Sequence, residues 1–277
     1  MELEDIQGKK YPGYGRCIYC GCRGEKYGLR SEHIIPFSLG GNAEIENASC
    51  KRCEGITSYL DGYLGRHIYN EYRSHAGVQS REPKKRPKSF PARIVVDENE
   101  EIRHLSVVDH PYFLAMPIWG NPGIVTGALP LDIFPIQKAH IFEYIPENLR
   151  ETMQITEQQS LQVRASGTIN HATFARAVAK IGYCHAIIRY GLDGFRKLVL
   201  PRLILGYYPC IPHFVGCELD DPPPPDPKER LHWVDFRTFQ FGRLKLIVAS
   251  IRLFAHSGVG KIGMPIYRVV VGAPKIT

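Results

Sequence analysis

Residues 31–41 read SEHIIPFSLGG and decide how the N-terminal part of the chain folds. Glu32 and His33 stand side by side at the start of a short apolar run, which a proline and then two glycines bring to an end. A short apolar run that is stopped by such residues is typical of a strand that leads into a loop. The sequence therefore predicts an acid and an imidazole together at the end of a strand.

Two cysteine pairs flank this stretch, CIYC at residues 17–20 and CKRC at residues 50–53. Each C-x2-C pair suits a zinc knuckle, a tight turn whose two thiolates point at one ion, and two knuckles complete a tetrahedral four-sulfur site. Cys22 is the alternative to Cys20, which we favour because the same spacing then occurs at both ends. We predict a structural zinc ion whose ligands are Cys17, Cys20, Cys50 and Cys53.

Composition is compatible with a protein that binds nucleic acid. The chain has 277 residues, enough for one large domain or two ordinary ones, with a net charge of +7 and a pI of about 8.9. No apolar run approaches the roughly 20 residues of a membrane helix, and the first ten residues lack the apolar stretch of a signal peptide. We expect a cytoplasmic location, where clustered cysteines are metal ligands rather than disulfides.

The chain divides into three blocks by composition. Residues 1–80 hold five of the eight cysteines. Residues 81–93 contain six Lys or Arg and three prolines, which predicts an extended basic linker, or alternatively an arm that contacts phosphates. Residues 94–277 combine strand-like and helix-like segments and are expected to form a larger accessory domain of mixed α+β structure.

The third block contains its own structural signals. Residues 93–108 predict two short strands around an acidic turn. Residues 170–191 predict an amphipathic helix with Asn170 as its N-cap, and Asp193 is expected to cap a second helix that ends before Pro201. The proline-rich residues 220–227 predict an exposed loop, and three strand-like segments follow, at residues 231–241, 243–255 and 265–272.

The N-terminal motifs, taken together, resemble the HNH endonuclease family. The resemblance covers roughly residues 14–70 and rests on CIYC, EHIIPFSLGG and NASCKRCEG in that order. It implies a small zinc-stabilised ββα-metal domain. The expected fold class is therefore α+β, with this unit followed by the larger mixed domain.

The resemblance also implies roles for individual residues. His33 matches the general base, and Glu32 matches the acid, usually Asp, that holds a catalytic metal ion. Asn47 matches the central asparagine that orients the base, with Asn42 as its competitor. Glu54 stands where the family usually has His or Asn as a further metal ligand. Two glutamates would favour Mg²⁺ or Mn²⁺ at the catalytic site.

Residues 54–74 predict the helix of the ββα unit, which in this family lies along the nucleic-acid groove. The candidate phosphate contacts are basic residues just before this helix, on it and in the linker: Lys51, Arg52, Arg66, Arg73, Lys84, Lys85 and Arg86.

Two functions follow from these patterns. The first is a metal-dependent endonuclease that hydrolyses phosphodiester bonds, with DNA favoured over RNA on the resemblance alone. The second is a catalytically silent zinc module that binds nucleic acid and is attached to a separate functional domain. Homodimerisation is left open by the sequence.

Overall fold

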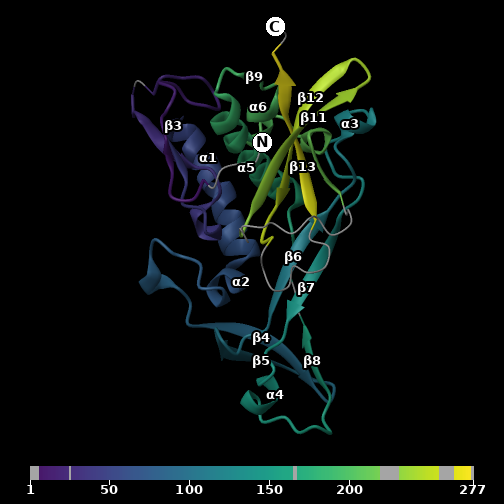
Figure 1. Cartoon of the computed structure of the whole chain (residues 1–277). Coiled ribbons are helices and arrows are strands. Elements are labelled where there is room, and N and C mark those ends of the chain that lie inside the picture. The colour runs from purple at the N-terminus through teal and green to yellow at the C-terminus, as the bar shows by residue number, and fades with distance from the viewer. Residues whose placement is uncertain (1–5, 25, 165–166, 219–230, 256–264, 276–277) are drawn as a thin grey trace.

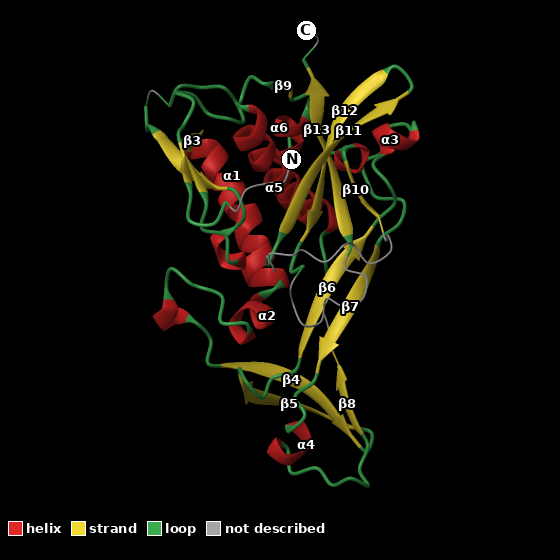
Figure 2. Ribbon diagram, in the orientation of Figure 1, coloured by secondary structure: helices red, strands yellow, loops and turns green. Residues whose placement is uncertain are grey.

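The computed structural model describes residues 6–24, 26–164, 167–218, 231–255 and 265–275. It is a mixed helix and strand structure, which confirms the predicted fold class (Figures 1 and 2). The loop predicted at residues 220–227 lies outside the described residues. No helix in the described part of the chain has the length and apolar character that spanning a membrane requires.

The N-terminal unit is a small sheet followed directly by a helix. Its strands are β1 (Lys10–Tyr11), β2 (Leu29–His33) and β3 (Glu44–Cys50), in the order β1-β3-β2, with β2 and β3 antiparallel. The loop between β2 and β3 contains a 3-10 turn, η1 (Phe37–Leu39), and helix α1 (Lys51–Gly62) begins where β3 ends.

Two glycines shape the loop that follows His33. Gly40 ends the 3-10 turn with φ 89°, in the left-handed region that favours glycine. Gly41 lies so close to Ile35 that an added Cβ would stand 2.2 Å from the Ile35 carbonyl oxygen. The Gly-Gly pair of the motif therefore lets the chain fold back tightly beside the end of β2.

The helix predicted over residues 54–74 is present but interrupted. After α1 the chain continues as a π-helical segment, η2 (Tyr63–Ile68), and then, beyond Tyr69, as α2 (Asn70–His75). A 3-10 turn, η3 (Pro83–Lys85), lies in the basic segment, whose last residues already belong to β4 (Ser89–Val96).

Helix α5 (His171–Tyr190) lies at the centre of the molecule, between α1 and a large antiparallel sheet (Figure 1). The Asn170 side chain accepts a hydrogen bond from the Thr173 backbone N–H at 2.9 Å, which confirms the predicted N-cap. The sheet has the order β10-β13-β12-β11, and β9 (Phe195–Arg196) pairs with β13. Its four main strands are β10 (Val215–Glu218), β11 (Trp233–Phe241), β12 (Leu244–Arg252) and β13 (Ile266–Pro274).

One helix prediction is wrong. The chain forms no helix over residues 193–199; α6 (Leu200–Ile204) begins after them, with Pro201 in its first turn, and η4 (Ile211–His213) follows it. Proline lacks the N–H that a first helical turn leaves unbonded anyway, so it begins helices readily. Asp193 forms an ion pair with Arg16 at 2.6 Å rather than capping a helix.

A narrower lobe extends from the body along the hairpin of β6 (Tyr112–Ile118) and β7 (Lys138–Tyr144) (Figure 2). The lobe is a sheet of β5 (Asn99–Ser106), β4 and β8 (Leu161–Arg164) with helix α4 (Leu149–Thr152) beside it. The two strands predicted in residues 93–108 are the paired β4 and β5. A short helix, α3 (Gly123–Thr126), lies in the connection between β6 and β7.

One hydrophobic cluster runs through the whole body. It contains Ile34 and Leu60 from the N-terminal unit, Phe174 from α5 and Tyr267 from β13, all of them fully buried. The lobe has a small cluster of its own, which includes Ile94 and Leu105. The division into residues 1–80, 81–93 and 94–277 stays a prediction, but the N-terminal unit shares its core with helix α5.

Candidate functional site

The four predicted zinc ligands come together at one end of the N-terminal unit. The thiol sulfurs of Cys17, Cys20, Cys50 and Cys53 all lie within 4.8 Å of one another. Zn–S bonds of about 2.3 Å in a tetrahedron require sulfurs roughly 3.8 Å apart, and the Cys20 and Cys50 sulfurs are 3.7 Å apart. Cys22 lies outside this group, with its sulfur 3.5 Å from that of Cys20. The four cysteines could therefore hold a metal ion such as zinc.

The pKa values of Cys17, Cys20 and Cys53 are strongly perturbed. A hydrogen bond with Cys53 lowers the pKa of Cys17 to about 4, and the same contact raises the pKa of Cys53. Burial raises the pKa of Cys20 to about 12. A divalent cation bound by these sulfurs would replace the thiol protons and offset the repulsion between the thiolates.

A second site surrounds His33, in a cavity of about 720 Å³ beside helix α1, which contains Cys53. It is lined by the end of β2, by one face of α1 and η2, and by residues 80–82. Three of the four residues predicted for catalysis line it, namely Glu32, His33 and Glu54. Four arginines line it as well: Arg30, Arg66, Arg73 and Arg81. Five acidic residues complete the charged lining, namely Glu32, Glu44, Glu54, Asp61 and Glu82, so the cavity combines an imidazole with both guanidinium and carboxyl groups.

His33 is half-buried and faces Arg81 of the basic segment. Arg81 Nη2 lies 3.2 Å from Nε2 and 3.4 Å from Nδ1 of the imidazole, and the Phe37 ring packs edge-on against His33 at 5.9 Å. Burial lowers the pKa of His33, and the positive charges of Arg81 and Lys180 lower it further. The imidazole is therefore neutral at neutral pH, the form in which it can accept a proton from water.

Glu32 is almost completely buried and is held on both of its oxygens. Oε1 lies 3.2 Å from the Lys180 ammonium, and Oε2 accepts a hydrogen bond from the Thr57 hydroxyl at 3.0 Å. Its exposed fraction is 3%, and burial raises the pKa of its carboxyl group. Lys180 comes from helix α5 and also contacts Asp61, at 3.0 Å.

Glu54 also has a cationic partner. Its carboxylate lies 3.3 Å from Arg30 Nε, and both side chains are partly exposed. Apart from the four cysteines, no three His, Cys, Asp or Glu residues in the described ranges bring their ligand atoms close enough to share an ion. The role of Glu32 and Glu54 as ligands of a divalent ion stays a prediction.

Neither candidate for the central asparagine lines the His33 cavity as described. Asn47 is exposed on β3 and adopts φ 47°, in the left-handed region. Asn42 accepts a hydrogen bond on Oδ1 from the Gly8 backbone N–H at 2.6 Å. Its contact ties the N-terminal segment to the hairpin loop, and the orienting role predicted for Asn47 stays a prediction.

The predicted phosphate contacts divide into two groups. Arg66 and Arg73 line the His33 cavity, and Arg73 Nε donates a hydrogen bond to the Ser38 carbonyl at 3.0 Å. The others lie outside it: Lys51 over the Tyr27 ring, Arg52 over the Tyr207 ring, Lys84 in solvent, Lys85 paired with Glu82 and Arg86 bonded to the Val78 carbonyl.

Sequence reasoning missed six charged residues of this site: Arg30, Arg81, Glu44, Asp61, Glu82 and Lys180. Lys180 had a signal, because it is the one lysine in the apolar run AVAKIGYCHAII, and a lone charge in such a run must find a partner. Arg81 lay in the segment interpreted as a linker. Its contact with His33 depends on a fold-back of the chain that has no local sequence signature.

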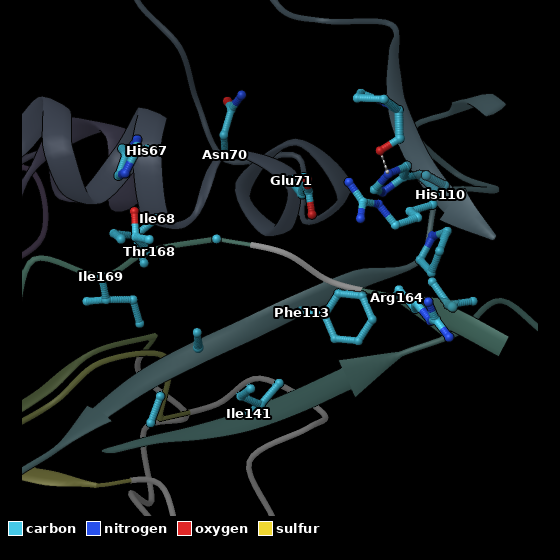
Figure 3. A pocket seen from close by; sticks show the side chains of 18 of the residues that line it. His67, Ile68, Asn70, Glu71, His110, Phe113, Ile141, Arg164, Thr168 and Ile169 are labelled. Atoms are coloured by element: carbon cyan, nitrogen blue, oxygen red, sulfur yellow. Dashed lines mark hydrogen bonds between the residues drawn. The ribbon is translucent and has the colours of Figure 1, made fainter. Parts of the chain in front are cut away.

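A second cavity, of about 560 Å³, lies between helix α2, the lobe strands and the β6–β7 hairpin. Figure 3 shows Glu71 of α2 opposite Phe113 of β6, with Arg164 at one side. The predicted catalytic residues and zinc ligands are absent from its described lining. Glu32, His33 and Glu54 thus line the cavity at His33 and not this one.

Comparison with known families gives one match. Residues 17–69 match a family model described as HNH endonuclease, which confirms the resemblance drawn from the motifs. The matched segment runs from the first zinc-site cysteine to the end of the π-helical segment and includes His33. Neither the curated proteins nor the solved structures contain a match to the chain.

Proposed function

Because residues 17–69 belong to an HNH endonuclease segment, we propose that this protein hydrolyses phosphodiester bonds in nucleic acid, with DNA as the favoured substrate. One observation carries the proposal: a neutral imidazole, His33, stands in a cavity whose lining includes four arginines beside five acidic side chains. Guanidinium groups bind phosphate oxygens through paired N–H donors. The same cavity therefore offers both groups that bind the phosphates of a nucleic acid and a general base.

In the proposed reaction the arginines hold the scissile phosphate beside His33. The imidazole takes a proton from a water molecule, which attacks the phosphorus in line with the departing 3′ oxygen. Arg81, within 3.4 Å of both ring nitrogens, stabilises the negative charge that develops on the phosphate. The products carry a 5′-phosphate and a 3′-hydroxyl.

The family resemblance adds a divalent ion, Mg²⁺ or Mn²⁺, on Glu32 and Glu54. Each of these carboxylates already has a cationic partner, Lys180 and Arg30 respectively. An ion bound there would supply Lewis-acid stabilisation of the negative charge on the phosphate and the departing oxygen. Zinc at the four cysteines has a structural role in the proposal, because it clamps the turn before β2 to the start of α1.

A plasmid-nicking assay tests the proposal. Supercoiled DNA is incubated with the wild-type protein, with His33→Ala and with His104→Ala, each with Mg²⁺, Mn²⁺ or EDTA. His104 is an exposed residue of strand β5 and serves as the matched control. Loss of a general base costs about 10²- to 10⁴-fold in rate, so His33→Ala should leave the plasmid intact. Undiminished cleavage by His33→Ala would exclude His33 as the base.

A second candidate function has its own support. The module would bind nucleic acid without cutting it, and what favours this is Glu32, whose two oxygens are both occupied inside the protein. Binding of labelled DNA that is tight and salt-dependent, together with no nicking under any metal condition, would support the silent module over the nuclease.

A further inference from the structure

The Lys180 ammonium lies inside a cage of oxygen atoms, with no exposure to solvent. Its Nζ is 3.2 Å from Glu32 Oε1 and 3.0 Å from both carboxylate oxygens of Asp61. It also donates a hydrogen bond to the His33 carbonyl oxygen at 2.5 Å. Four oxygens from three residues of the N-terminal unit therefore surround one nitrogen that comes from helix α5.

Oxygens from carboxylates and a backbone carbonyl are the donors that hard divalent cations take in proteins. A buried carboxylate without a partner is costly, so the charged form of Glu32 requires an ammonium or an ion, and without either the group takes up a proton. Lys180 reaches the cage from the core side, while Asp61 and His33 also line the cavity. The place that a metal ion would take at Glu32 is thus filled by the chain itself.

We infer that Lys180 is the resident cation of this cage, which replaces a divalent ion at Glu32 and positions the backbone of His33. The part that Lys180 plays in catalysis rests on the proposed function. The inference makes Lys180 a positioning residue, since the ammonium touches the carbonyl oxygen of His33 and not the imidazole. It also predicts that Glu32 gains affinity for a divalent ion only when the ammonium is removed.

Mn²⁺ binding to the zinc-loaded protein, measured by titration calorimetry, tests the inference without any cleavage reaction. We expect Lys180→Ala to bind one additional Mn²⁺ per chain, at least about tenfold more tightly than the wild-type protein does. The double variant Lys180→Ala/Glu32→Gln should lose that binding. The matched control is Lys197→Ala, because Lys197 also donates to a carbonyl, that of Leu192, and pairs with an aspartate, Asp193. It should behave as the wild type.

Two results would overturn the inference. The first is a wild-type protein that binds one Mn²⁺ and loses it in Glu32→Gln, since the ion would then already be the partner of Glu32. This comparison needs no lysine variant and holds even when Lys180→Ala does not fold. The second is a folded Lys180→Ala that binds Mn²⁺ no better than Lys197→Ala. Failure of DNA nicking beside the expected Mn²⁺ results would reject the nuclease and leave the resident cation in place.

Discussion

The guanidinium of Arg81 lies 3.2 Å from Nε2 of His33, although 48 positions separate the two residues in the sequence. The contact brings the start of the basic segment to the end of strand β2. The guanidinium also lies over the Phe37 ring, 5.5 Å from its centroid, so the same aromatic side chain contacts both groups. Of the two interpretations of residues 81–93, this geometry favours an arm that takes part in the site.

Replacement of Arg81 by alanine should slow DNA cleavage by about 10- to 100-fold, because a charge-assisted hydrogen bond to phosphate contributes roughly 1.5–3 kcal/mol. Initial nicking rates on a supercoiled plasmid measure the effect. Arg103→Ala is the matched control, since Arg103 is an exposed arginine of β5 that pairs with Glu101 and lies outside the cavity. Equal rates for the two variants would remove Arg81 from the site.

Metal removal should unfold the N-terminal unit. The purified protein is expected to contain one zinc ion per chain, and Cys50→Ser should lose that ion together with several kcal/mol of stability. Cys22→Ser is the control, because Cys22 lies outside the four-sulfur group, and it should retain zinc. Elemental analysis combined with thermal melts in the presence and absence of chelator measures both effects. Loss of zinc in Cys22→Ser but not in Cys20→Ser would reverse the ligand assignment.

Stability should fall as the pH falls below about 6.5. Burial lowers the pKa of His185 and of His232 to about 4 each, against about 6.5 in an unfolded chain. Between these values the unfolded chain binds protons at both positions and the folded chain does not. The free energy of unfolding therefore decreases toward acid pH, by up to roughly 3 kcal/mol per histidine at pH 4, and neither residue contributes a slope above about pH 7.

Urea unfolding at pH 7.5, 6.5 and 5.5 measures this dependence. His185→Gln should reduce the slope of stability against pH, because it removes one of the buried histidines whose pKa is lowered. His104→Ala should leave the slope unchanged, since that histidine is exposed. A slope that is the same in all three proteins would show that buried imidazoles do not govern the acid response.

The Gly-Gly pair of the motif should tolerate substitution poorly. A Cβ at Gly41 would stand 2.2 Å from the Ile35 carbonyl oxygen, and backbone cannot yield that space. We expect Gly41→Ala to cost more than about 2 kcal/mol, at the high end for a single substitution. Gly55→Ala is the control: it lies in α1 with nothing within 4 Å of the added atom and should gain up to about 1 kcal/mol. Chemical unfolding compares the two.

Local sequence signals predicted the parts of the fold that are built locally. The cysteine spacing, the acid–histidine pair and the Gly-Gly stop together indicated the hairpin and helix around the zinc site, and Asn170 marked the start of α5. Pro201 was interpreted as the end of a helix and begins one instead. A proline can stand just after one helix or in the first turn of the next, and the three-dimensional packing decides between the two.

The partners of Glu32 could not be predicted in the same way. Lys180 is 147 positions from His33 in the sequence, and no local pattern around either residue predicts their contact. The motif predicted an acid that awaits an ion, whereas the structure supplies an ammonium from another part of the chain. Long-range packing of α5 on α1 decides which partner the carboxylate has, and that packing arises from the shared hydrophobic core.

The shared core has a consequence for synthesis on the ribosome. The hydroxyl of Tyr183 donates a hydrogen bond to the Ile18 carbonyl at 2.5 Å, and Lys180 contacts Glu32, so α5 completes a unit translated long before it. A nascent chain that has exposed only its first 80 residues still lacks the helix that neutralises its buried acid. The N-terminal unit therefore reaches its final packing late in translation, after the helix has left the exit tunnel.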